Sequence, residues 1–281
     1  MIRRALLMAS RSDGLKEFSA KAPVARNVVT RYVAGDGTTE AVRTAAELAE
    51  AGLLATIDHL GEDTVNLEQA DSIRDAYLEL LSGLAAAGLA GTAEVSVKLS
   101  AVGQALPGDG PKIATENARV ICQAAAAIGT TVTLDMEDHT TTDLTLDTLR
   151  TLRQDFPWVG AVVQAYLYRT EADCRDLAYE GSRVRLCKGA YREPESVAFQ
   201  SRADVDLSYV RCMKVLMNGK GYPMLATHDP RLIDIAEALA VRAHRQRGEY
   251  EYQMLYGVRP DEQARLASQG EKMRVYVPYG A

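Results

Sequence analysis

The feature that most constrains this chain is the regular alternation of strand-like and helix-like segments along its length. Eight short runs are rich in β-branched and aromatic residues, and they lie at 54–61, 95–103, 131–140, 160–168, 184–191, 222–229, 250–257 and 273–280. Longer segments with Ala and Leu at helical spacing separate them, for example 66–88, 112–129 and 229–248. Strands that alternate with helices in this way indicate βαβ units and a parallel sheet.

Eight such units in 281 residues favour a (β/α)8 barrel over a doubly wound open sheet. An open sheet that binds a nucleotide would carry GxGxxG or GxxxxGK[ST] at an early strand-to-helix turn, and neither motif occurs. We therefore expect an N-terminal helical segment at 1–50 and a barrel at 51–281. Because the sequence stops directly after the eighth run, we expect this barrel to lack its final helix.

Composition excludes several classes of protein. The net charge is −6 and the pI about 5.4, so there is no basic surface for nucleic acid. The N-terminal apolar run, Ala5 to Ala9, is too short for a secretory signal or a membrane span. We expect a cytoplasmic protein whose short N-terminal amphipathic helix makes at most loose membrane contact. The cysteines are far apart and indicate reduced thiols; they are Cys122, Cys174, Cys187 and Cys212.

Polar residues inside the predicted strands or just after them are the candidates for chemistry, because active sites of such barrels lie at the C-terminal ends of the strands. In chain order they are Asp58, His59, Lys98, Ser100, Asp135, Glu137, Asp138, His139, Gln164, Tyr166, Arg185, Lys188, Tyr191, Thr227, His228, Asp229, Glu251, Gln253, Tyr256, Arg274, Tyr276 and Tyr279.

Buried charges at these positions are costly unless they are paired. Lys98 and Asp135 lie on neighbouring strands, so we expect an ion pair between them, either as a barrel-closing salt bridge or as part of a site. Arg185 and Lys188 are two cations on one strand, and the Gly-Ala turn after them leaves the backbone open to a flat or anionic ligand. The amide of Gln164 suits the edge of a flavin or a base, although it could equally serve the barrel's own hydrogen bonding.

Two other chemistries were weighed from the residues alone. The segment "DMEDH" offers carboxylates and a histidine, but the four histidines are scattered without HxH or HExxH spacing, so we expect no metal site. A Schiff-base aldolase that uses Lys98 or Lys188 remains open, because the sequence does not show whether either lysine has a depressed pKa.

The strand ends taken together resemble the proline dehydrogenase family, both the monofunctional bacterial enzyme and the corresponding domain of proline utilisation A. The matching stretches occur in family order and cover most of the chain; they are "VSVKLSA", "LDMEDH", "VVQAYLYR", "VRLCKGAYREP", "ATHD", "EYQMLYGVR" and "RVYVPYG". The ending "KGAYREP", which has no Trp after the Tyr, looks like the monofunctional branch.

The resemblance implies a distorted (β/α)8 barrel of TIM type that holds non-covalent FAD at its mouth. Gln164 would contact the pyrimidine side of the flavin, and Arg185 would lie near its N5. The other residues implied in cofactor binding are Met136, Lys188, Gly189, Ala190, Thr227, His228 and Gln253.

The resemblance also implies the reaction. L-proline would be oxidised to Δ1-pyrroline-5-carboxylate by hydride transfer to flavin N5, the first step of proline catabolism. Asp135 and Arg185 would be catalytic, and the substrate pocket would be formed by Lys98, Tyr191, Leu255 and Tyr276. Reoxidation by a membrane quinone would imply transient contact with the inner face of the cell membrane.

The sequence departs from the family at its end. Members continue past "VPYG" with a helix whose Arg-Arg pair clamps the substrate carboxylate, and we expect that clamp to be absent after Ala281. A related flavin barrel that acts on another substrate, and a barrel that binds FAD without turnover, are therefore kept as alternatives.

Overall fold

The structure is a computed structural model that describes residues 31–61 and 63–280, and the amphipathic helix expected near the N-terminus lies outside them. Eight parallel strands form one sheet in the order β3-β2-β1-β8-β7-β6-β5-β4. They are β1 (Leu54–His59), β2 (Ala93–Val97), β3 (Val132–Leu134), β4 (Ala161–Gln164), β5 (Arg183–Cys187), β6 (Tyr222–Ala226), β7 (Glu251–Leu255) and β8 (Met273–Tyr279). Each predicted run overlaps one of these strands, although β2 and β5 begin two residues and one residue before their runs, and this confirms the predicted (β/α)8 fold.

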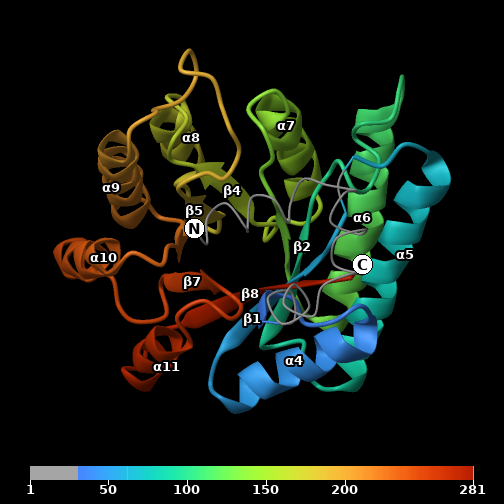
Figure 1. Ribbon diagram of the computed structural model, residues 1–281, viewed down its shortest axis with the longest axis horizontal. Coiled ribbons are helices and arrows are strands. Elements are labelled where there is room, and N and C mark those ends of the chain that lie inside the picture. The colour runs from blue at the N-terminus through green and yellow to red at the C-terminus, as the bar shows by residue number, and fades with distance from the viewer. Residues whose placement is uncertain (1–30, 62, 281) are drawn as a thin grey trace, which may run out of the picture.

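Helices lie between consecutive strands and surround the sheet (Figure 1). They are α4 (Thr38–Glu50), α5 (Leu67–Ala86), α6 (Gly110–Ile128), α7 (Thr142–Arg153), α8 (Thr170–Leu177), α9 (Arg202–Asn218), α10 (Pro230–Arg242) and α11 (Pro260–Ser268). Side-chain caps fix where some of them begin: Asn66 accepts a hydrogen bond from the Gln69 amide, and Ser201 accepts one from the Asp204 amide.

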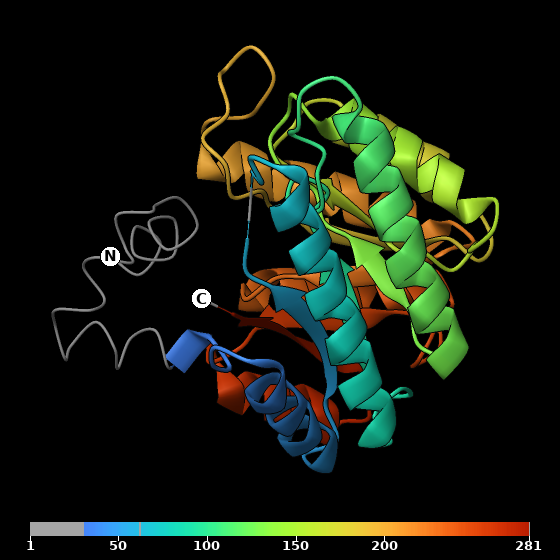
Figure 2. The same cartoon turned by 90° about the vertical axis from the view of Figure 1, so that its right-hand side faces the viewer.

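Helix α4 precedes β1 and packs against both β1 and β8 (Figure 2). Its small residues Ala41 and Ala45 are fully buried in the core. Two backbone hydrogen bonds of 2.9 Å, Ala34 N to Pro278 O and Gly280 N to Gly35 O, tie the segment before α4 to the end of β8. The outer face of the last strand is thus covered by the helix that comes before the first strand.

The barrel closes between β3 and β4 through a single bridge, Thr133 to Gly160. Gly160 donates to the Val132 carbonyl at 2.8 Å, and its own carbonyl accepts from Leu134 at 3.0 Å. A Cβ at position 160 would lie only 2.5 Å from Thr133 Oγ1. Glycine is needed here because the two strands approach too closely for any larger residue.

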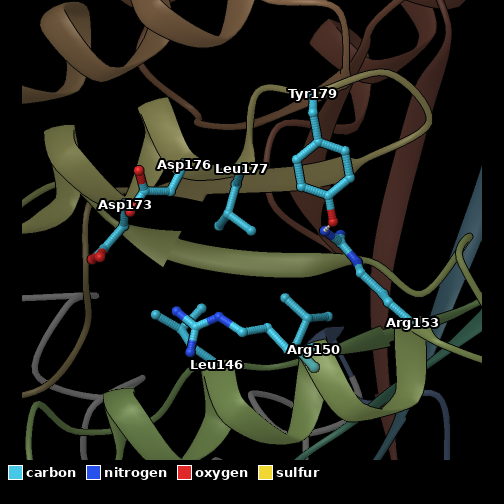
Figure 3. Close-up of a pocket in the computed structure, with 8 residues that line it drawn as sticks. Leu146, Arg150, Arg153, Asp173, Asp176, Leu177 and Tyr179 are labelled. Carbon is cyan, nitrogen blue, oxygen red and sulfur yellow. Dashed lines mark hydrogen bonds between the residues drawn. The ribbon is translucent and has the colours of Figure 1, made fainter.

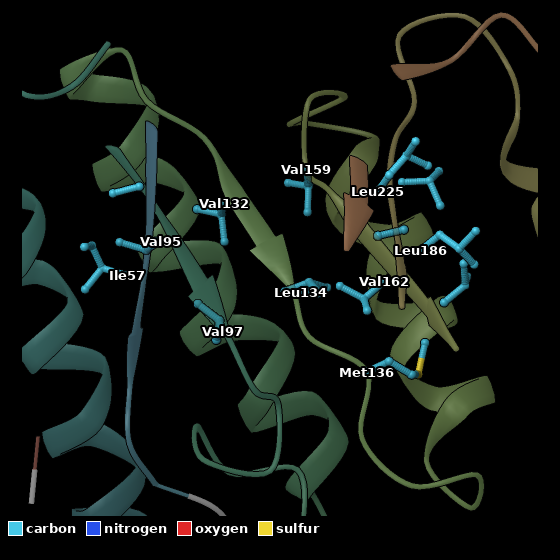
Figure 4. Close-up of a cluster of buried hydrophobic side chains, with 14 of the residues drawn as sticks. Ile57, Val95, Val97, Val132, Leu134, Met136, Val159, Val162, Leu186 and Leu225 are labelled. Atoms are coloured by element: carbon cyan, nitrogen blue, oxygen red, sulfur yellow. The ribbon is translucent and has the colours of Figure 1, made fainter. Parts of the chain in front are cut away.

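The hydrophobic core lies between the sheet and the helices (Figure 4). Alternate residues of the strands face it, for example Ile57, Val95, Val97 and Leu186, which are all fully buried. The intervening residues, such as Glu94 and Ser96 on β2, therefore face the inside of the barrel. The sheet's inward face is where this protein places its buried charges.

Candidate active site

Four charges form a network low in the barrel, here called the lower charge layer: the buried Glu94, Glu251 and Arg274 and the partly buried Arg183. Arg183 donates to Glu94 at 2.7 Å, and Arg274 Nε donates to Glu251 at 2.7 Å. Arg274 also lies 3.8 Å from Glu94, so the two pairs are joined. Burial alone would raise the pKa of Glu94, but the two arginines outweigh it and hold the pKa below its ordinary range.

A second group of polar residues lies closer to the C-terminal ends of the strands, and we call it the mouth layer: Asp58, Lys98, Asp135, Arg185 and Tyr276. At its centre, Arg185 donates from Nη1 to Asp135, and Tyr276 donates to the other oxygen of Asp135 at 2.6 Å. The Arg185 guanidinium also lies over the Tyr276 ring, 5.2 Å from its centroid. Three residues expected at the site are therefore in direct contact.

Gln253 connects the two layers. Its Oε1 accepts from Arg185 Nε at 2.6 Å, and its Nε2 donates to Glu251 at 2.6 Å. The side chain is almost fully buried. Gln253 was expected to contact a cofactor, and the structure gives it bonds that set the orientation of Arg185.

Lys98 Nζ donates to Asp58 Oδ2 at 2.7 Å. Lys98 and Asp135, expected to pair with each other, thus each have another partner, Asp58 for the first and Arg185 for the second. Burial raises the pKa of Asp58; Lys98 counteracts this and nearby Asp135 adds to it. The mouth layer contains two carboxylates, one lysine and one arginine, so the formal charges of these groups sum to zero.

Some bonding capacity of the mouth layer is unused within the described part of the chain. Arg185 Nη2 and Asp58 Oδ1 are buried and have no hydrogen-bond partner there, and the same holds for Arg183 Nη1 in the lower layer. A buried guanidinium N–H without a partner is costly. At the mouth such a donor is well placed to bind a polar group of a ligand.

Gln164, at the end of β4, donates from Nε2 to the backbone carbonyl of Glu137 at 2.7 Å. Because the Gln164 amide nitrogen is used in this bond, the Gln164 amide oxygen is the group that can accept a hydrogen bond from another molecule. The Glu137 carboxylate itself accepts from both the amide and the hydroxyl of Ser100. Burial nevertheless raises the pKa of Glu137, and the bonds from Ser100 only partly offset the rise.

The predicted cofactor residues at the ends of β5 and β6 have varied environments. Lys188 Nζ is bonded to Asp206 at 2.5 Å and lies 3.3 Å from Asp229. Thr227 accepts from the Asp229 amide at 3.1 Å. His228 Nε2 accepts from the Leu255 amide at 2.9 Å, which requires a neutral ring.

Burial, together with nearby Arg259, lowers the pKa of His228 to about 4. The imidazole is therefore neutral at physiological pH and ties the end of β6 to β7. Leu255, expected to line the substrate pocket, is held by this bond and is half-buried.

The turn after β5 packs closely on Tyr166. Gly189 has φ +110°, and a Cβ there would lie 2.4 Å from the Tyr166 ring, so its backbone has to stay bare. Ala190 is exposed and Tyr191 is half-buried, whereas Met136 is buried beside the apolar cluster drawn in Figure 4. Bare backbone, a spare guanidinium donor and an oriented amide fit a flat ligand with polar edges.

Three residues without a role predicted from the sequence form hydrogen bonds in or near the mouth layer. Asp58 was a strand-end candidate but received no role, and Ser96 and Glu193 were not considered. Ser96 lies 3.3 Å from Arg185 Nη1, and Glu193 binds two residues of other loops. Alternation along β2 would have placed Ser96 inward with Glu94, but the loop residue Glu193 carries no such signal.

Other possible sites were compared with the mouth. A small cleft of about 80 Å³ lies between α7 and α8, where Arg150, Arg153 and Tyr179 are among its lining residues (Figure 3). Arg153 donates there to Tyr179 and to the backbone of Val159 and Arg183, so it serves the packing of the barrel's lower end. Within residues 31–61 and 63–280, no cluster of three His, Cys, Asp or Glu side chains is arranged to hold a metal ion.

The bonding of the lysines bears on Schiff-base chemistry. Lys98 is paired with Asp58, and Lys188 with Asp206 and Asp229. Pairing with carboxylates favours the protonated ammonium, whereas a Schiff base requires a neutral amine. The geometry does not favour an aldolase.

Comparison with known proteins shows the family of this chain. A family model described as proline dehydrogenase matches residues 41–281. Proline dehydrogenase 1 of Bacillus subtilis is 36% identical over 280 residues, which cover 100% of this chain and 91% of that protein. The proline dehydrogenase of Deinococcus radiodurans is 38% identical over 256 residues, which cover 90% of this chain and 82% of that protein.

Solved structures show the same fold. Proline utilisation A from Bdellovibrio bacteriovorus, inactivated by N-propargylglycine, aligns with a TM-score of 0.86 at 24% identity, over 99% of this chain and 35% of that one. A mutant of proline utilisation A from Bradyrhizobium japonicum aligns with a TM-score of 0.73 at 22% identity, over 90% of this chain and 29% of that one. This chain thus spans about a third of the length of these larger proteins. With a family match over most of its length and relatives at 36–38% identity, the chain belongs to the proline dehydrogenase family of oxidoreductases.

Proposed function

We propose that this protein oxidises L-proline to Δ1-pyrroline-5-carboxylate with FAD bound at the mouth of the barrel. The observation that carries the proposal is the bonded group of Arg185, Asp135 and Tyr276, with a guanidinium donor left over, in a member of this family. FAD, when bound, supplies the hydride acceptor at its N5.

The residues present fit FAD as a flat ligand with polar edges. Arg185 Nη2 offers a buried donor, and the Gln164 amide is turned by Glu137 so that its oxygen is an acceptor. Gly189 and Ala190 offer bare or exposed backbone. We assign further contacts to Met136, Lys188, Thr227 and His228, and we assign Gln253 the task of orienting Arg185.

Arg185 holds its positive charge firmly. Burial would lower its pKa, but Asp135, followed by Tyr276, more than compensates, so the pKa of Arg185 is raised. A permanent cation near an electron-rich ring stabilises the reduced form of that ring. Asp135 keeps the guanidinium in place, and this is why we call both residues catalytic.

We assign the substrate pocket to Lys98, Tyr191, Leu255 and Tyr276. Lys98 is a cation for the substrate carboxylate, and Asp58 holds its ammonium in position. Burial, with Asp135 and Asp58 nearby, raises the pKa of Tyr276, so its hydroxyl stays protonated and serves as a donor. The substrate amine has to lose its proton before hydride can leave the neighbouring carbon.

We also propose that a membrane quinone reoxidises the flavin through transient contact with the bilayer. Of the helices in the described residues, none combines the length and apolarity needed to cross a membrane.

The test uses the purified 281-residue protein supplied with FAD. A flavin absorbance band that stays with the protein through gel filtration and is bleached by L-proline without oxygen is the expected result. Retained flavin without bleaching would favour a related barrel with another substrate. No retained flavin would overturn the proposal.

A further inference from the structure

The loop that follows β5, residues 188–200, is hydrogen-bonded near both of its ends to residues just after β4, and we call this loop the strap. Tyr166 N donates to Lys188 O at 2.9 Å, Phe199 N donates to Tyr166 O at 2.8 Å, and Tyr168 N donates to Val197 O at 3.0 Å. The two ends of the strap are thus fixed by backbone bonds. Its middle, from Gly189 to Glu193, needs another support.

Glu193 supplies that support. Its carboxylate is 3% exposed and accepts three hydrogen bonds from two other loops. The His139 amide donates at 2.9 Å, the His139 ring binds through Nδ1, and the Tyr166 hydroxyl donates at 3.2 Å. A buried carboxylate is stable only with such partners, so the bonds hold Glu193 in one position.

Tyr166 supports the strap at two points. Its ring lies directly under Gly189, where even a Cβ would come within 2.4 Å, and its hydroxyl reaches Glu193 four residues later. Only Ala190, Tyr191 and Arg192 lie between the two supports. These three residues are therefore flanked by two supports, the Tyr166 ring at Gly189 and the hydrogen-bonded carboxylate of Glu193.

We propose that Glu193 is a positioning residue that acts through Tyr191: by anchoring the strap to His139 and Tyr166 it places the Tyr191 side chain at the substrate pocket. The inference rests on the proposed function, because it takes Tyr191 as part of the proline site. Glu193 itself is not assigned a contact with substrate or cofactor. Loss of its charge should therefore affect proline binding more than flavin retention.

The kinetic test is a double-mutant cycle on the FAD-loaded protein with a soluble dye as electron acceptor. Glu193→Gln keeps the size of the side chain but weakens the three bonds, and we expect KM for L-proline to rise about tenfold while kcat and FAD content change less. In a Tyr191→Ala background the same substitution should change KM little further, because its target is gone. Equal effects in both backgrounds, or an unchanged KM, would overturn the proposal.

The matched control is Glu195→Gln, two residues along the same strap. Glu195 is exposed, and within the described residues its backbone carbonyl, but not its carboxylate, accepts a hydrogen bond, from the Tyr168 hydroxyl. We expect this variant to match the wild type in KM, kcat and FAD content. A rise in KM equal to that of Glu193→Gln would show that the strap responds to any loss of charge.

A second measurement does not depend on turnover. Tyr166→Phe keeps the ring under Gly189 and removes only the hydroxyl that binds Glu193. We expect trypsin to cleave the folded protein faster after Arg192, which is exposed in the strap. Unchanged cleavage would contradict the anchoring role even if the wild type does not oxidise proline, so this outcome separates failure of the inference from failure of the proposed function.

Discussion

Glu94 in the lower charge layer and Asp58 in the mouth layer are both buried carboxylates, but the pKa of Glu94 is lowered and that of Asp58 is raised. Burial raises the pKa in both cases. At Glu94 two arginines reverse the effect, whereas at Asp58 one lysine competes with burial and with a second carboxylate. The two carboxylates therefore differ in how many cations lower the pKa of each: Arg183 and Arg274 chiefly at Glu94, and Lys98 at Asp58.

The contrast extends to hydrogen bonds. Glu94 also accepts from Thr56 at 2.9 Å and from Thr131 at 2.5 Å, so the sheet itself solvates it. Asp58 Oδ1 has no partner among the described residues. Among the described residues, each layer contains a buried guanidinium N–H without a partner, but the mouth layer also contains a buried carboxylate oxygen without one.

The largest effect on stability is expected from Glu94→Gln. The substitution leaves Arg183 buried without its counter-charge, and the free energy of unfolding should fall by about 3–5 kcal/mol. Urea denaturation measures this. The control is Asp147→Asn at the exposed pair with Arg150, where the change should stay within about 0.5 kcal/mol. Similar losses of unfolding free energy in both variants would mean that the lower charge layer contributes no more to stability than an exposed ion pair does.

The largest effect on function is expected from Arg185→Ala. Flavin reduction by proline should slow on the order of 10²–10³-fold, or FAD should be lost, because the mouth loses its central cation. Stopped-flow absorbance measures the reduction. The matched variant is Arg183→Ala, two residues earlier on β5, which should lower stability but leave reduction in the folded fraction nearly unchanged. Unchanged bleaching by proline in Arg185→Ala would remove the role that we assign to this residue.

His228, just after β6, and Glu94, in the lower charge layer, should lose their contributions to stability in different pH ranges. His228 has an ordinary pKa of 6.5 and a folded pKa of about 4, so the unfolded chain binds more protons and stability falls as pH drops from 6.5 to 4. The expected loss is on the order of 2–3 kcal/mol. Glu94 also has a lowered pKa, so its contribution is present above 4.5 and disappears at still lower pH.

The variant His228→Gln should flatten the fall of stability between pH 6.5 and 4 in denaturation curves recorded at several pH values. His244→Asn is the control, because this histidine is exposed and its positive φ of 56° suits Asn. A curve for His228→Gln with the same slope as the wild type would show that another group causes the fall.

The smallest expected effects come from two Tyr→Phe substitutions, one at Tyr276 of the mouth layer and one at Tyr222, which bonds to Glu251 of the lower charge layer. Tyr276→Phe removes a donor to Asp135 and should lower kcat/KM for proline about tenfold. Tyr222→Phe removes a donor to Glu251 at 3.2 Å and should lower the free energy of unfolding by about 1 kcal/mol without a change in kcat/KM. Equal kinetic effects would mean that the two layers do not differ in function.

Residue patterns predict many of the polar residues in the site, but they do not predict which of these residues bond to each other. The residue pattern predicted the strands and selected Arg185, Asp135 and Tyr276 as polar residues inside or just after them, and these three are in contact. Lys98 could reach an acid on either neighbouring strand, and strand stagger, which no local pattern encodes, brings Asp58 to it. Glu193 lies in a loop, and only the approach of His139 from another loop gives its carboxylate a buried environment.

Closure of the sheet has a consequence for how the protein reaches its native state. The most extensive pairing joins the first strand to the last, from Leu54 with Arg274 to His59 with Tyr279, whereas mid-chain neighbours β3 and β4 share a single bridge. The central ladder therefore forms between segments more than 200 residues apart in sequence. Contacts of such long range slow folding. During synthesis on a ribosome, β1 can pair with β2 early, but its ladder with β8 forms only after the rest of the barrel has been synthesised.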